Sequence, residues 1–429
     1  MSKALEIQTA AGPIRGQVRP PGSKSITNRA LVCAALADGV SQLSGALDSE
    51  DTRVMVDGLG RLGIEVESQE AGTRLLVHGA GGEIPALEAD LFCANSGTTV
   101  RFLTALATLG HGSFRLDGVE RMRQRPIGDL LEALNQMGTH ASSENGNNCP
   151  PVVVHANGLP GGVAKIRGDI SSQYLSGVLM AAPRARGLVE LMIDGRLVSR
   201  PYVRMTLAVM KSFGVSVKTS GELQQFQIPA PQQYAACEYP IEPDASAASY
   251  FWAAAATCGG EVTVEGLTAN SLQGDVAFVE CLEKMGCEVR RDSASITVIG
   301  RPLLGIDVDM NAISDTVQTL AVVAIFAEGP TRIREVGHIR HKETDRIGAV
   351  ATELRKLGVE VLEHDDGLTI KPGNSRELKP ATIETYHDHR MAMSFALAGL
   401  RIPGVQIANP SCVEKTYPLF FEDLTKLVR

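Results

Sequence analysis

The sequence lacks the marks of several common protein classes. It contains no apolar run long enough to span a bilayer, and its first residues lack the apolar segment of a secretory signal. Its eight cysteines form no C-x-x-C pair and no cluster with histidine. We therefore expect buried, reduced thiols in a cytoplasmic protein, with no metal site.

Nucleotide-binding motifs and an excess of positive charge are also missing. The segment G-S-K-S at 22–25 is not a Walker motif, because serine precedes the lysine and Val18 stands where a glycine is needed. No G-x-G-x-x-G follows a predicted strand. The net charge of −8 argues against binding to nucleic acid or a membrane surface, so any anion site must depend on local clustering of cations.

The chain has the composition of an ordinary globular protein. Apolar residues make up 44% and charged residues 21%, and 429 residues are too many for a single core. Prolines cluster at 20–21 and 239–244, which are candidate hinges. We therefore predict one domain over 21–240, inserted into a second domain built from 1–20 and 241–429.

A repeated unit accounts for most of the chain. Amphipathic helical patterns end in glycine at intervals of 72 to 76 residues, and a short two-strand pattern follows each; the glycines are Gly63, Gly138, Gly214, Gly286 and Gly358. A sixth such helix, 418–427, is followed by no strands. The strand–turn–strand pattern at 5–18 is therefore predicted to complete the sixth copy.

A second helix, apolar nearly all round, is predicted ahead of each amphipathic one. This pattern is typical of helices buried inside a domain, and the six segments are 28–37, 97–109, 171–182, 245–256, 314–327 and 388–400. Each unit then consists of a strand, a buried helix, a strand, an outer helix and two strands. The predicted fold class is α/β, with six units and three in each domain.

The segment 340–346, R-H-K-E-T-D-R, concentrates charge at the start of an amphipathic helix. Lys342 and Arg346 are four residues apart, so a helix would place them on one face, and Asp345 can cap its N-terminus. Such a site attracts anions, and Glu343 beside it is a candidate acid or base. Taken alone, the pattern also fits a solvated first turn supported by a Glu343–Arg346 ion pair.

Polar residues gather at the starts of other predicted helices too. Individually they fit helix caps, and Ser171 and Asp315 are examples. Together, seven cations would be costly to crowd without anionic ligands: Lys24, Arg29, Arg125, Lys342, Arg346, Arg390 and Lys415.

Several motifs resemble those of the EPSP synthases, a family of enolpyruvyl transferases. They are P-G-S-K-S-x-x-N-R-A at 21–30, R-M-R-Q-R-P-I-G at 121–128, S-S-Q at 171–173, D-A-S-x-A-S-Y-F at 244–251, K-E-T-D-R at 342–346, D-H-R-M-A-M at 388–393 and K-T-Y-P at 415–418. The resemblance runs nearly end to end. It implies a two-domain inside-out α/β barrel with buried parallel helices. It also implies transfer of the enolpyruvyl group of phosphoenolpyruvate to the 5-hydroxyl of shikimate 3-phosphate, by a monomer without metal or organic cofactor.

The resemblance also implies the site residues, with the 21–240 domain on the shikimate 3-phosphate side and the catalytic carboxylates in the other. Expected shikimate 3-phosphate ligands are Lys24, Ser25, Arg29, Ser171, Ser172, Gln173, Ser199, Tyr202, Asp315, His338 and Lys342. Expected phosphoenolpyruvate ligands are Lys24, Asn95, Gly97, Arg125, Gln173, Arg346, Arg390 and Lys415. The acid and base candidates are Glu343 and Asp315, assisted by Lys24 and His389, and the sequence does not say which carboxylate performs which step.

Three positions depart from the family pattern. His338 stands where asparagine is usual, and its charge would be expected to vary with pH. Phe102 and Ser96 replace a common proline and alanine beside the expected phosphoenolpyruvate site. Gly97, which lets backbone lie against a ligand, predicts sensitivity to the family's inhibitor glyphosate.

Two alternatives remain at this point. The sister enzyme that acts on UDP-N-acetylglucosamine would show a Lys-Asn pair near the start and a cysteine before the second outer helix. Here Ser25 follows Lys24, and no cysteine lies between Cys93 and Cys149. A non-catalytic repeat scaffold would explain the periodicity but not the cations beside Glu343 and Asp315.

Overall fold

Two compact units make up the computed structural model, which describes residues 4–373 and 378–428. Unit 1 combines Met1–Pro21 with Glu242–Arg429, and unit 2 is Gly22–Ile241. The ends of the predicted outer domain, 1–3 and 429, lie outside the described residues, as do 374–377 within it.

Three helices form the interior of each unit, as the apolar segments predicted. In unit 2 they are α1 (Lys24–Ala35), α3 (Gly97–Ala107) and α5 (Ser172–Ala181), and in unit 1 they are α7 (Ala245–Cys258), α9 (Val317–Ala324) and α11 (His389–Gly399). Nearly every side chain on them is buried. The segment predicted as one helix at 314–327 instead begins with a 3₁₀ turn, η5 (Asn311–Thr316), that holds Asp315.

The amphipathic helices are also present, and each exposes one face. They are α2 (Glu50–Arg61), α4 (Gly128–Gln136), α6 (Arg200–Ser212), α8 (Phe278–Lys284), α10 (Arg346–Lys356) and α12 (Phe420–Val428). The prediction that Lys342 and Arg346 share a helix face is wrong. The side chain of Asp345 accepts bonds from the backbone of Ile347 and Gly348 at 3.1 Å, so α10 begins at Arg346 and Lys342 precedes it.

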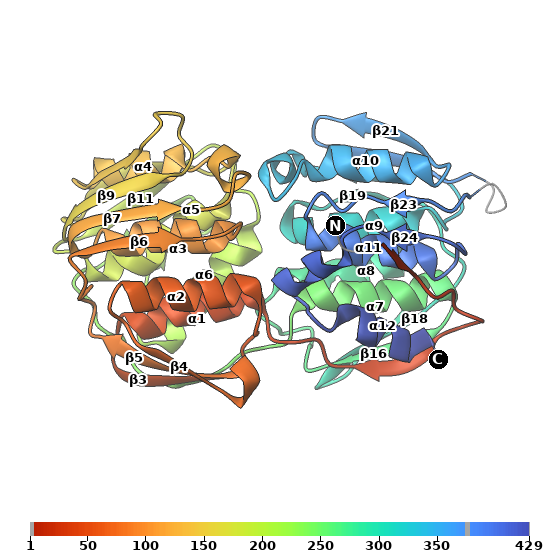
Figure 1. The fold of residues 1–429 in the computed structure, drawn as a ribbon, viewed down its shortest axis with the longest axis horizontal. Helices are drawn as coiled ribbons and strands as arrows, with labels where there is room; N and C mark the ends of the chain where they lie inside the picture. Colours follow the sequence, from red (N-terminus) through yellow and green to blue (C-terminus); the bar gives the residue numbers. More distant parts are fainter. Residues whose placement is uncertain (1–3, 374–377, 429) are drawn as a thin grey trace. The chain divides into compact units, whose positions relative to one another are not determined.

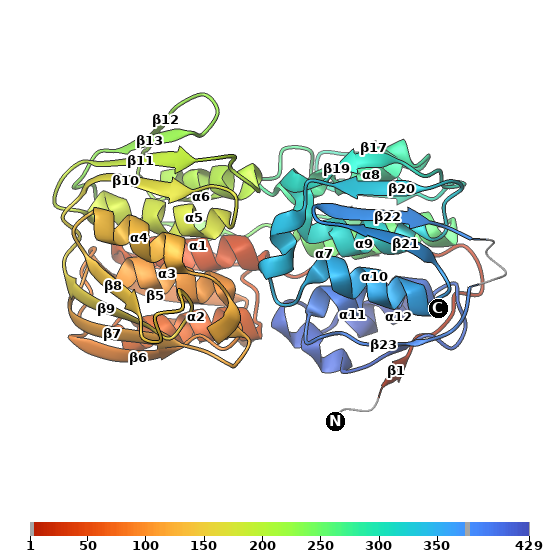
Figure 2. The ribbon, with the colours of Figure 1, turned by 90° about the horizontal axis from the view of Figure 1, so that it is seen from above.

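Within residues 4–373 and 378–428, six sheets lie around these helices, and five of the sheets share one topology (Figures 1 and 2). In each of these five sheets, the first two strands are parallel. The two strands that follow the outer helix form a hairpin, which pairs with them in antiparallel order. In unit 2 this gives β6 (Glu88–Phe92), β7 (His111–Asp117), β9 (Val152–Asn157) and β8 (His140–Ser143), then β10 (Gly162–Arg167), β11 (Val189–Asp194), β13 (Gln225–Ile228) and β12 (Lys218–Thr219).

The third sheet of unit 2 takes its parallel strands from the end of that unit. β14 (Tyr234–Ala235) and β15 (Glu238–Pro240) pair with β3 (Ala37–Ser44), which continues to β5 (Arg74–Ala80) and β4 (Val66–Gln69). The unit is thus closed upon itself, because its last strands complete its first sheet.

Unit 1 has two sheets of the same kind and one smaller sheet. The former are β19 (Asp307–Asp309), β20 (Thr331–Arg334), β22 (Gly367–Lys371) and β21 (Glu360–His364), and β2 (Arg15–Val18), β16 (Glu261–Glu265), β18 (Ser295–Ile299) and β17 (Glu288–Arg291). The smaller sheet is β23 (Thr382–Ile383), β24 (Gln406–Ile407) and β1 (Leu5–Glu6).

The prediction that residues 5–18 complete the sixth copy is therefore only half right. β1 does join the sixth copy, since Leu5 pairs with Ile407. β2 instead runs parallel to β16 in the sheet of the fourth copy, with Gly16 opposite Val262. A local strand–turn–strand pattern does not identify strand partners, because pairing is decided by distant segments.

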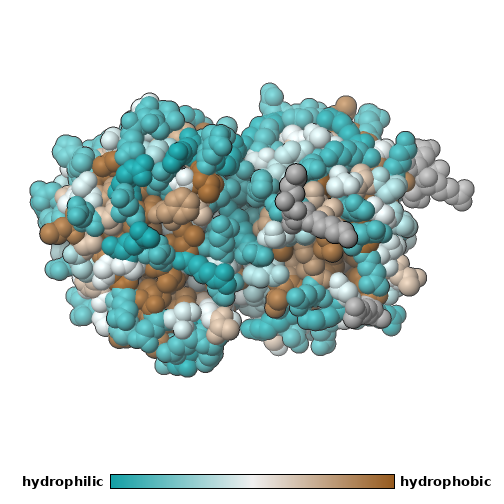
Figure 3. Space-filling model, in the orientation of Figure 1, coloured by the Kyte–Doolittle hydropathy of each residue, from teal (hydrophilic) through white to brown (hydrophobic). Residues whose placement is uncertain are grey.

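The surface in Figure 3 is mainly hydrophilic, with hydrophobic patches interspersed. Among the described residues, no helix combines the length and the apolar character needed to cross a bilayer.

The packing of α2 against α3 gives a matched test of stability. A Cβ added at Gly58 would collide with Cδ1 of Leu103, which is fully buried, whereas one at Gly60 would meet nothing within 4 Å. We expect Gly60→Ala to raise the free energy of unfolding by ~0.5–1 kcal/mol through helix propensity. Gly58→Ala should lower it by about 1 kcal/mol, since overpacking outweighs that gain. Urea unfolding followed by circular dichroism would measure both, and equal effects would contradict the packing argument.

Candidate active site

One largely buried carboxylate in unit 1 has three cations as partners. Asp315 Oδ1 lies 2.5 Å from Lys342 Nζ and 3.1 Å from Arg346 Nη1, and its Oδ2 lies 2.8 Å from Arg390 Nη2. Burial alone would raise the pKa of Asp315, but these cations hold that pKa well below its usual range. The end of η5, the segment that leads into α10 and the start of α11 therefore meet at an ionised carboxylate.

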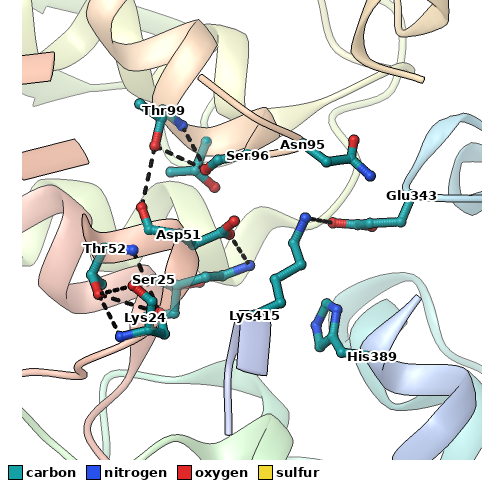
Figure 4. Close-up of polar contacts among 12 residues, drawn as sticks. Lys24, Ser25, Asp51, Thr52, Asn95, Ser96, Thr99, Glu343, His389 and Lys415 are labelled. Carbon is teal, nitrogen blue, oxygen red and sulfur yellow. Dashed lines mark hydrogen bonds and ion pairs between the residues drawn. The ribbon is translucent and has the colours of Figure 1, made fainter. Parts of the chain in front are cut away.

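Arg346 links that carboxylate to two others. Its Nη2 donates to Glu343 Oε2 at 2.9 Å and its Nε donates to Asp388 Oδ2 at 2.8 Å. Lys415 Nζ lies 3.5 Å from Glu343 Oε1 (Figure 4). Burial would lower the pKa of Arg346, which is 1% exposed, yet Asp388, Glu343 and Asp315 raise it above its usual value. The carboxylate predicted as acid or base thus lies between two cations, and it is not part of a solvated surface turn.

Two histidines near this network, His389 and His338, are largely shielded from solvent. His389 is 1% exposed, and its Nδ1 lies 3.7 Å from Asp388 Oδ1. At His338, burial and then the charge of Lys342 lower the pKa to about 3. With this pKa the imidazole of His338 stays neutral around neutral pH, and the expected change of its charge falls at acidic pH.

A second cluster lies in unit 2, at the starts of its buried helices. Lys24, the first residue of α1, pairs with Asp51 of α2 at 3.2 Å (Figure 4). The backbone carbonyl of Asp51 accepts a bond from the Thr99 hydroxyl of α3 at 3.5 Å. The three helices thereby hold the lysine at a defined place. Ser25 follows it, and the carbonyl of Ser25 accepts from Arg29 Nη1 at 2.8 Å.

Arg29 is fully buried and is held by neutral oxygens. Its Nε donates to the Thr206 hydroxyl at 2.7 Å, and its Nη2 donates more weakly to Ser176 and to the carbonyl of Tyr202. The guanidinium also lies over the rings of Phe102 and Tyr202, at 5.2 and 5.9 Å. Burial lowers the pKa of Arg29 to about 10. The phenylalanine that departs from the family pattern therefore supports a predicted ligand residue directly.

Arg125 is likewise held by neutral oxygens. Its Nη1 donates to the backbone and side-chain oxygens of Asn95, at 2.9 and 3.2 Å. A Cβ at Gly97 would collide with Arg125 Nη2 and come within 2.8 Å of its Cζ. The glycine therefore leaves room for a guanidinium, whereas the sequence had indicated only close approach of a ligand.

The remaining predicted residues of unit 2 lie at the starts of α5 and α6. Ser171 caps α5 by accepting a bond from Gln173 N at 3.3 Å, and Ser172 is its first helical residue. Ser199 precedes α6 in the left-handed conformation, with φ 52°. Tyr202 follows in the first turn. The structure thus places the predicted residues of unit 2 at or beside helix starts, except Arg29, which lies in the second turn of α1.

The argument that the seven cations need anionic ligands to balance their charge does not hold for unit 1. There Lys342, Arg346, Arg390 and Lys415 all have protein carboxylates as partners. In unit 2, Lys24 pairs with Asp51, and within the described residues Arg29 and Arg125 form no ion pair. The argument from unneutralised charge therefore applies to those two arginines.

Sequence reasoning missed four charged residues of these clusters: Asp51, Arg101, Asp275 and Asp388. Asp388 and Arg101 could have been found, since a helix-capping aspartate in D-H-R and an arginine within an apolar helix are visible in the sequence. Asp275 is buried against Ser246, and its burial, followed by the charge of Asp315, raises its pKa to about 6. No local pattern indicates that placement.

Comparisons with known proteins agree along the whole chain. The sequence pattern of the family described as EPSP synthase (3-phosphoshikimate 1-carboxyvinyltransferase) matches residues 8–424. A 3-phosphoshikimate 1-carboxyvinyltransferase of Nostoc punctiforme is 50% identical over 97% of each chain. The chloroplastic enzyme of that name from Arabidopsis thaliana is 48% identical over 100% of this chain and 85% of its own. The EPSP synthase structure from Acinetobacter baumannii superposes with a TM-score of 0.82 at 26% identity, covering 99% of this chain and 98% of that one.

The lowered pKa of His338 predicts how folding depends on pH. Below its ordinary pKa of 6.5 the unfolded chain binds a proton there, whereas the folded chain does so only near pH 3. The free energy of unfolding should therefore fall as the pH drops from 6.5 towards 3. We expect His338→Asn to reduce the loss of stability between pH 7 and pH 5, measured by urea unfolding. The control is His140→Asn, an exposed histidine in β8. An unchanged loss in His338→Asn would contradict the placement of the imidazole.

Proposed function

The chain belongs to the EPSP synthase family, and from that premise we propose how its residues carry out the family's reaction. The enzyme transfers the enolpyruvyl group of phosphoenolpyruvate to the 5-hydroxyl of shikimate 3-phosphate and releases phosphate. This is a step of the shikimate pathway, and glyphosate is the family's inhibitor. The residue roles below are our proposal.

We further propose the finer features of the fold and its setting. Each domain is an inside-out α/β barrel of three units, with hinges at 20–21 and 239–244. The enzyme works as a cytoplasmic monomer without metal or organic cofactor. Reduced thiols support the location, since all eight cysteines are free and five of them are buried.

The cations of the two clusters bind the anionic groups of the substrates. Phosphoenolpyruvate is held by Lys24, Asn95, Gly97, Arg125, Gln173, Arg346, Arg390 and Lys415. Shikimate 3-phosphate is held by Lys24, Ser25, Arg29, Ser171, Ser172, Gln173, Ser199, Tyr202, Asp315, His338 and Lys342. Guanidinium groups pair with carboxylate and phosphate through two parallel hydrogen bonds, which supports this use of the arginines.

Two proton transfers are needed in the addition step. A base takes the proton of the 5-hydroxyl as its oxygen bonds to the central carbon of phosphoenolpyruvate, and an acid protonates the methylene carbon. The tetrahedral product then loses a methyl proton and phosphate, which restores the double bond. We assign the two groups as Asp315 and Glu343, because each is a carboxylate held among cations that bind substrate.

The cations around Asp315 also explain how its basicity could be controlled. At rest Lys342, Arg346 and Arg390 keep its pKa low, so it is a weak base. Arriving phosphate and carboxylate groups share the same cations, which weakens their hold on Asp315 and raises its affinity for a proton. Substrate binding would thus activate the base.

Lys24 and His389 assist in this scheme. Lys24 supplies positive charge to the departing phosphate, and a fixed cation stabilises charge that develops in the transition state. His389 lies beside Asp388 and immediately precedes Arg390 in the chain, and it helps to hold the acid–base network. For the overall activity, the decisive measurement is phosphate release from phosphoenolpyruvate with shikimate 3-phosphate as acceptor. Release only with UDP-N-acetylglucosamine would overturn the assignment.

The position of Glu343 between Arg346 and Lys415 gives the sharpest test of the residue roles. We expect Glu343→Gln to lower kcat by about 10²–10⁴-fold, the usual range for loss of a proton-transfer group. Binding of shikimate 3-phosphate, measured by calorimetry, should persist. Glu280→Gln, on the exposed face of α8, is the control and should retain turnover. Wild-type kcat in Glu343→Gln would remove it from the chemistry.

The contact between Gly97 and Arg125 changes what Gly97→Ala should do. The added methyl must displace the guanidinium of Arg125, so the KM for phosphoenolpyruvate should rise on the order of 10-fold or more. Inhibition by glyphosate, which is longer than phosphoenolpyruvate, should weaken by a larger factor.

Steady-state kinetics with glyphosate as a competitor of phosphoenolpyruvate would measure both effects of Gly97→Ala. Gly60→Ala, whose methyl meets nothing, is the control. If Gly97→Ala leaves both the KM for phosphoenolpyruvate and the inhibition constant of glyphosate unchanged, then neither the position of Arg125 nor the phosphoenolpyruvate site depends on this glycine.

A further inference from the structure

Arg101 contacts Gln173, one of the predicted ligand residues of unit 2. It sits one turn into α3, is 5% exposed, and was not among the residues that the sequence singled out. Its Nη1 lies 2.5 Å from Gln173 Oε1. On the other side of the same carboxamide, Gln173 Nε2 donates to the Thr98 hydroxyl at 3.0 Å.

This arrangement fixes which way the carboxamide faces. A guanidinium carries only N–H donors and no acceptor, so the atom of Gln173 facing Arg101 must be its oxygen. The amide nitrogen then has to lie on the opposite side. One of its two N–H bonds is used by Thr98, and the second remains for a ligand. Gln173 can therefore offer a donor to a ligand on the side of its amide nitrogen, while its carbonyl oxygen is turned towards Arg101.

Arg101 is itself held in place from two further directions. Its Nη2 donates to the carbonyl of Pro126 at 3.2 Å, and its guanidinium lies over the ring of Tyr174 at 5.1 Å. The hydroxyl of Tyr174 also donates to the Pro126 carbonyl, at 2.6 Å. That carbonyl would keep a partner without Arg101. Loss of the arginine would leave the Gln173 oxygen without this donor.

We propose that Arg101 is a positioning residue that turns the Gln173 carboxamide so that its N–H side faces the oxyanions of phosphoenolpyruvate. The inference rests on the proposed role of Gln173 in substrate binding. Both oxyanionic groups of phosphoenolpyruvate accept hydrogen bonds, and an amide oxygen turned towards them would repel them. Without Arg101 the carboxamide could rotate by 180° and present the wrong atom in a share of the molecules.

A double-mutant cycle tests this role. Arg101→Met removes the donors while keeping an unbranched apolar chain, and Gln173→Met removes the carboxamide. We expect each change to lower kcat/KM for phosphoenolpyruvate by about 10- to 100-fold, the cost of a hydrogen bond to a charged group, mainly through KM. The double variant should lose at most about threefold more than Gln173→Met, because Arg101 acts through Gln173. Fully multiplied losses would overturn the proposal.

Two further variants test the polarity of the carboxamide. Gln173→Glu keeps an oxygen for Arg101 but turns a second oxygen towards the ligand, so it should lose more kcat/KM than Gln173→Met. Arg101→Lys retains a donor and should recover at least part of the loss in Arg101→Met. Gln173→Glu at or above the activity of Gln173→Met, or no recovery by lysine, would contradict the orienting role.

Controls separate this proposal from the assignment of Gln173 and from general damage. Arg53→Met removes an exposed arginine that pairs with Asp48, and it should leave kcat/KM unchanged. Melting temperatures of the Arg101 variants show whether they fold, and Arg101→Lys carries the test if Arg101→Met does not. If Gln173→Met has no effect, its role in binding fails. If Gln173→Met is impaired and Arg101→Met is not, only the positioning role fails.

Discussion

The convergence of three cations on Asp315 is the interaction on which the organisation of unit 1 depends. A buried carboxylate is costly to ionise, and so are buried lysine and arginine side chains, but each stabilises the other at distances of 2.5 to 3.1 Å. Removing Asp315 would take from Lys342, Arg346 and Arg390 the carboxylate that they share. The network therefore fixes the positions of η5, α10 and α11 relative to one another. The network also keeps the cations in place for a substrate anion, which could take over part of the hydrogen bonding and negative charge that Asp315 provides.

The repeated unit explains why charged groups can gather there at all. Each buried helix is mainly apolar and carries its charged residues in or just before its first two turns, as in α11, where Asp388 caps the helix ahead of His389 and Arg390. Sheets cover the outside of the helices, so the side chains at helix starts are the ones left to form a site. Backbone N–H groups at those starts add further donors for anions. The fold thus determines where function can lie, and the residues at the helix starts determine which chemistry results.

The sequence predicted the repeating pattern better than it predicted individual contacts. The all-round apolar segments identified the six interior helices because periodicity is a local property; these helices are α1, α3, α5, α7, α9 and α11. Local patterns failed where the outcome depended on distant residues. Lys342 has helical spacing from Arg346 but precedes the helix and pairs with Asp315, 27 residues earlier in the chain. The partner of Lys24 is Asp51, in another helix. The pKa of His338 could not be predicted, because burial beside Lys342 exists only in the folded chain.

The two clusters stabilise buried positive charge with different partners: carboxylates in unit 1, and for Arg29 and Arg125 neutral oxygens in unit 2. This difference affects how each cluster could act in catalysis. In unit 1 the cations face Asp315, Glu343 and Asp388, so an arriving anion must compete with carboxylates that are already bound. In unit 2 the guanidiniums of Arg29 and Arg125 are held by hydroxyl and carbonyl oxygens, which a charged ligand can outcompete. Binding energy should therefore come mainly from unit 2. In unit 1 an anion should gain less affinity, but by drawing cations away from Asp315 it would change the proton affinity of the carboxylate that we propose to be catalytic. Under the proposed roles both clusters bind substrate, and the kind of partner that each cation has decides whether binding also changes the proton affinity of a carboxylate.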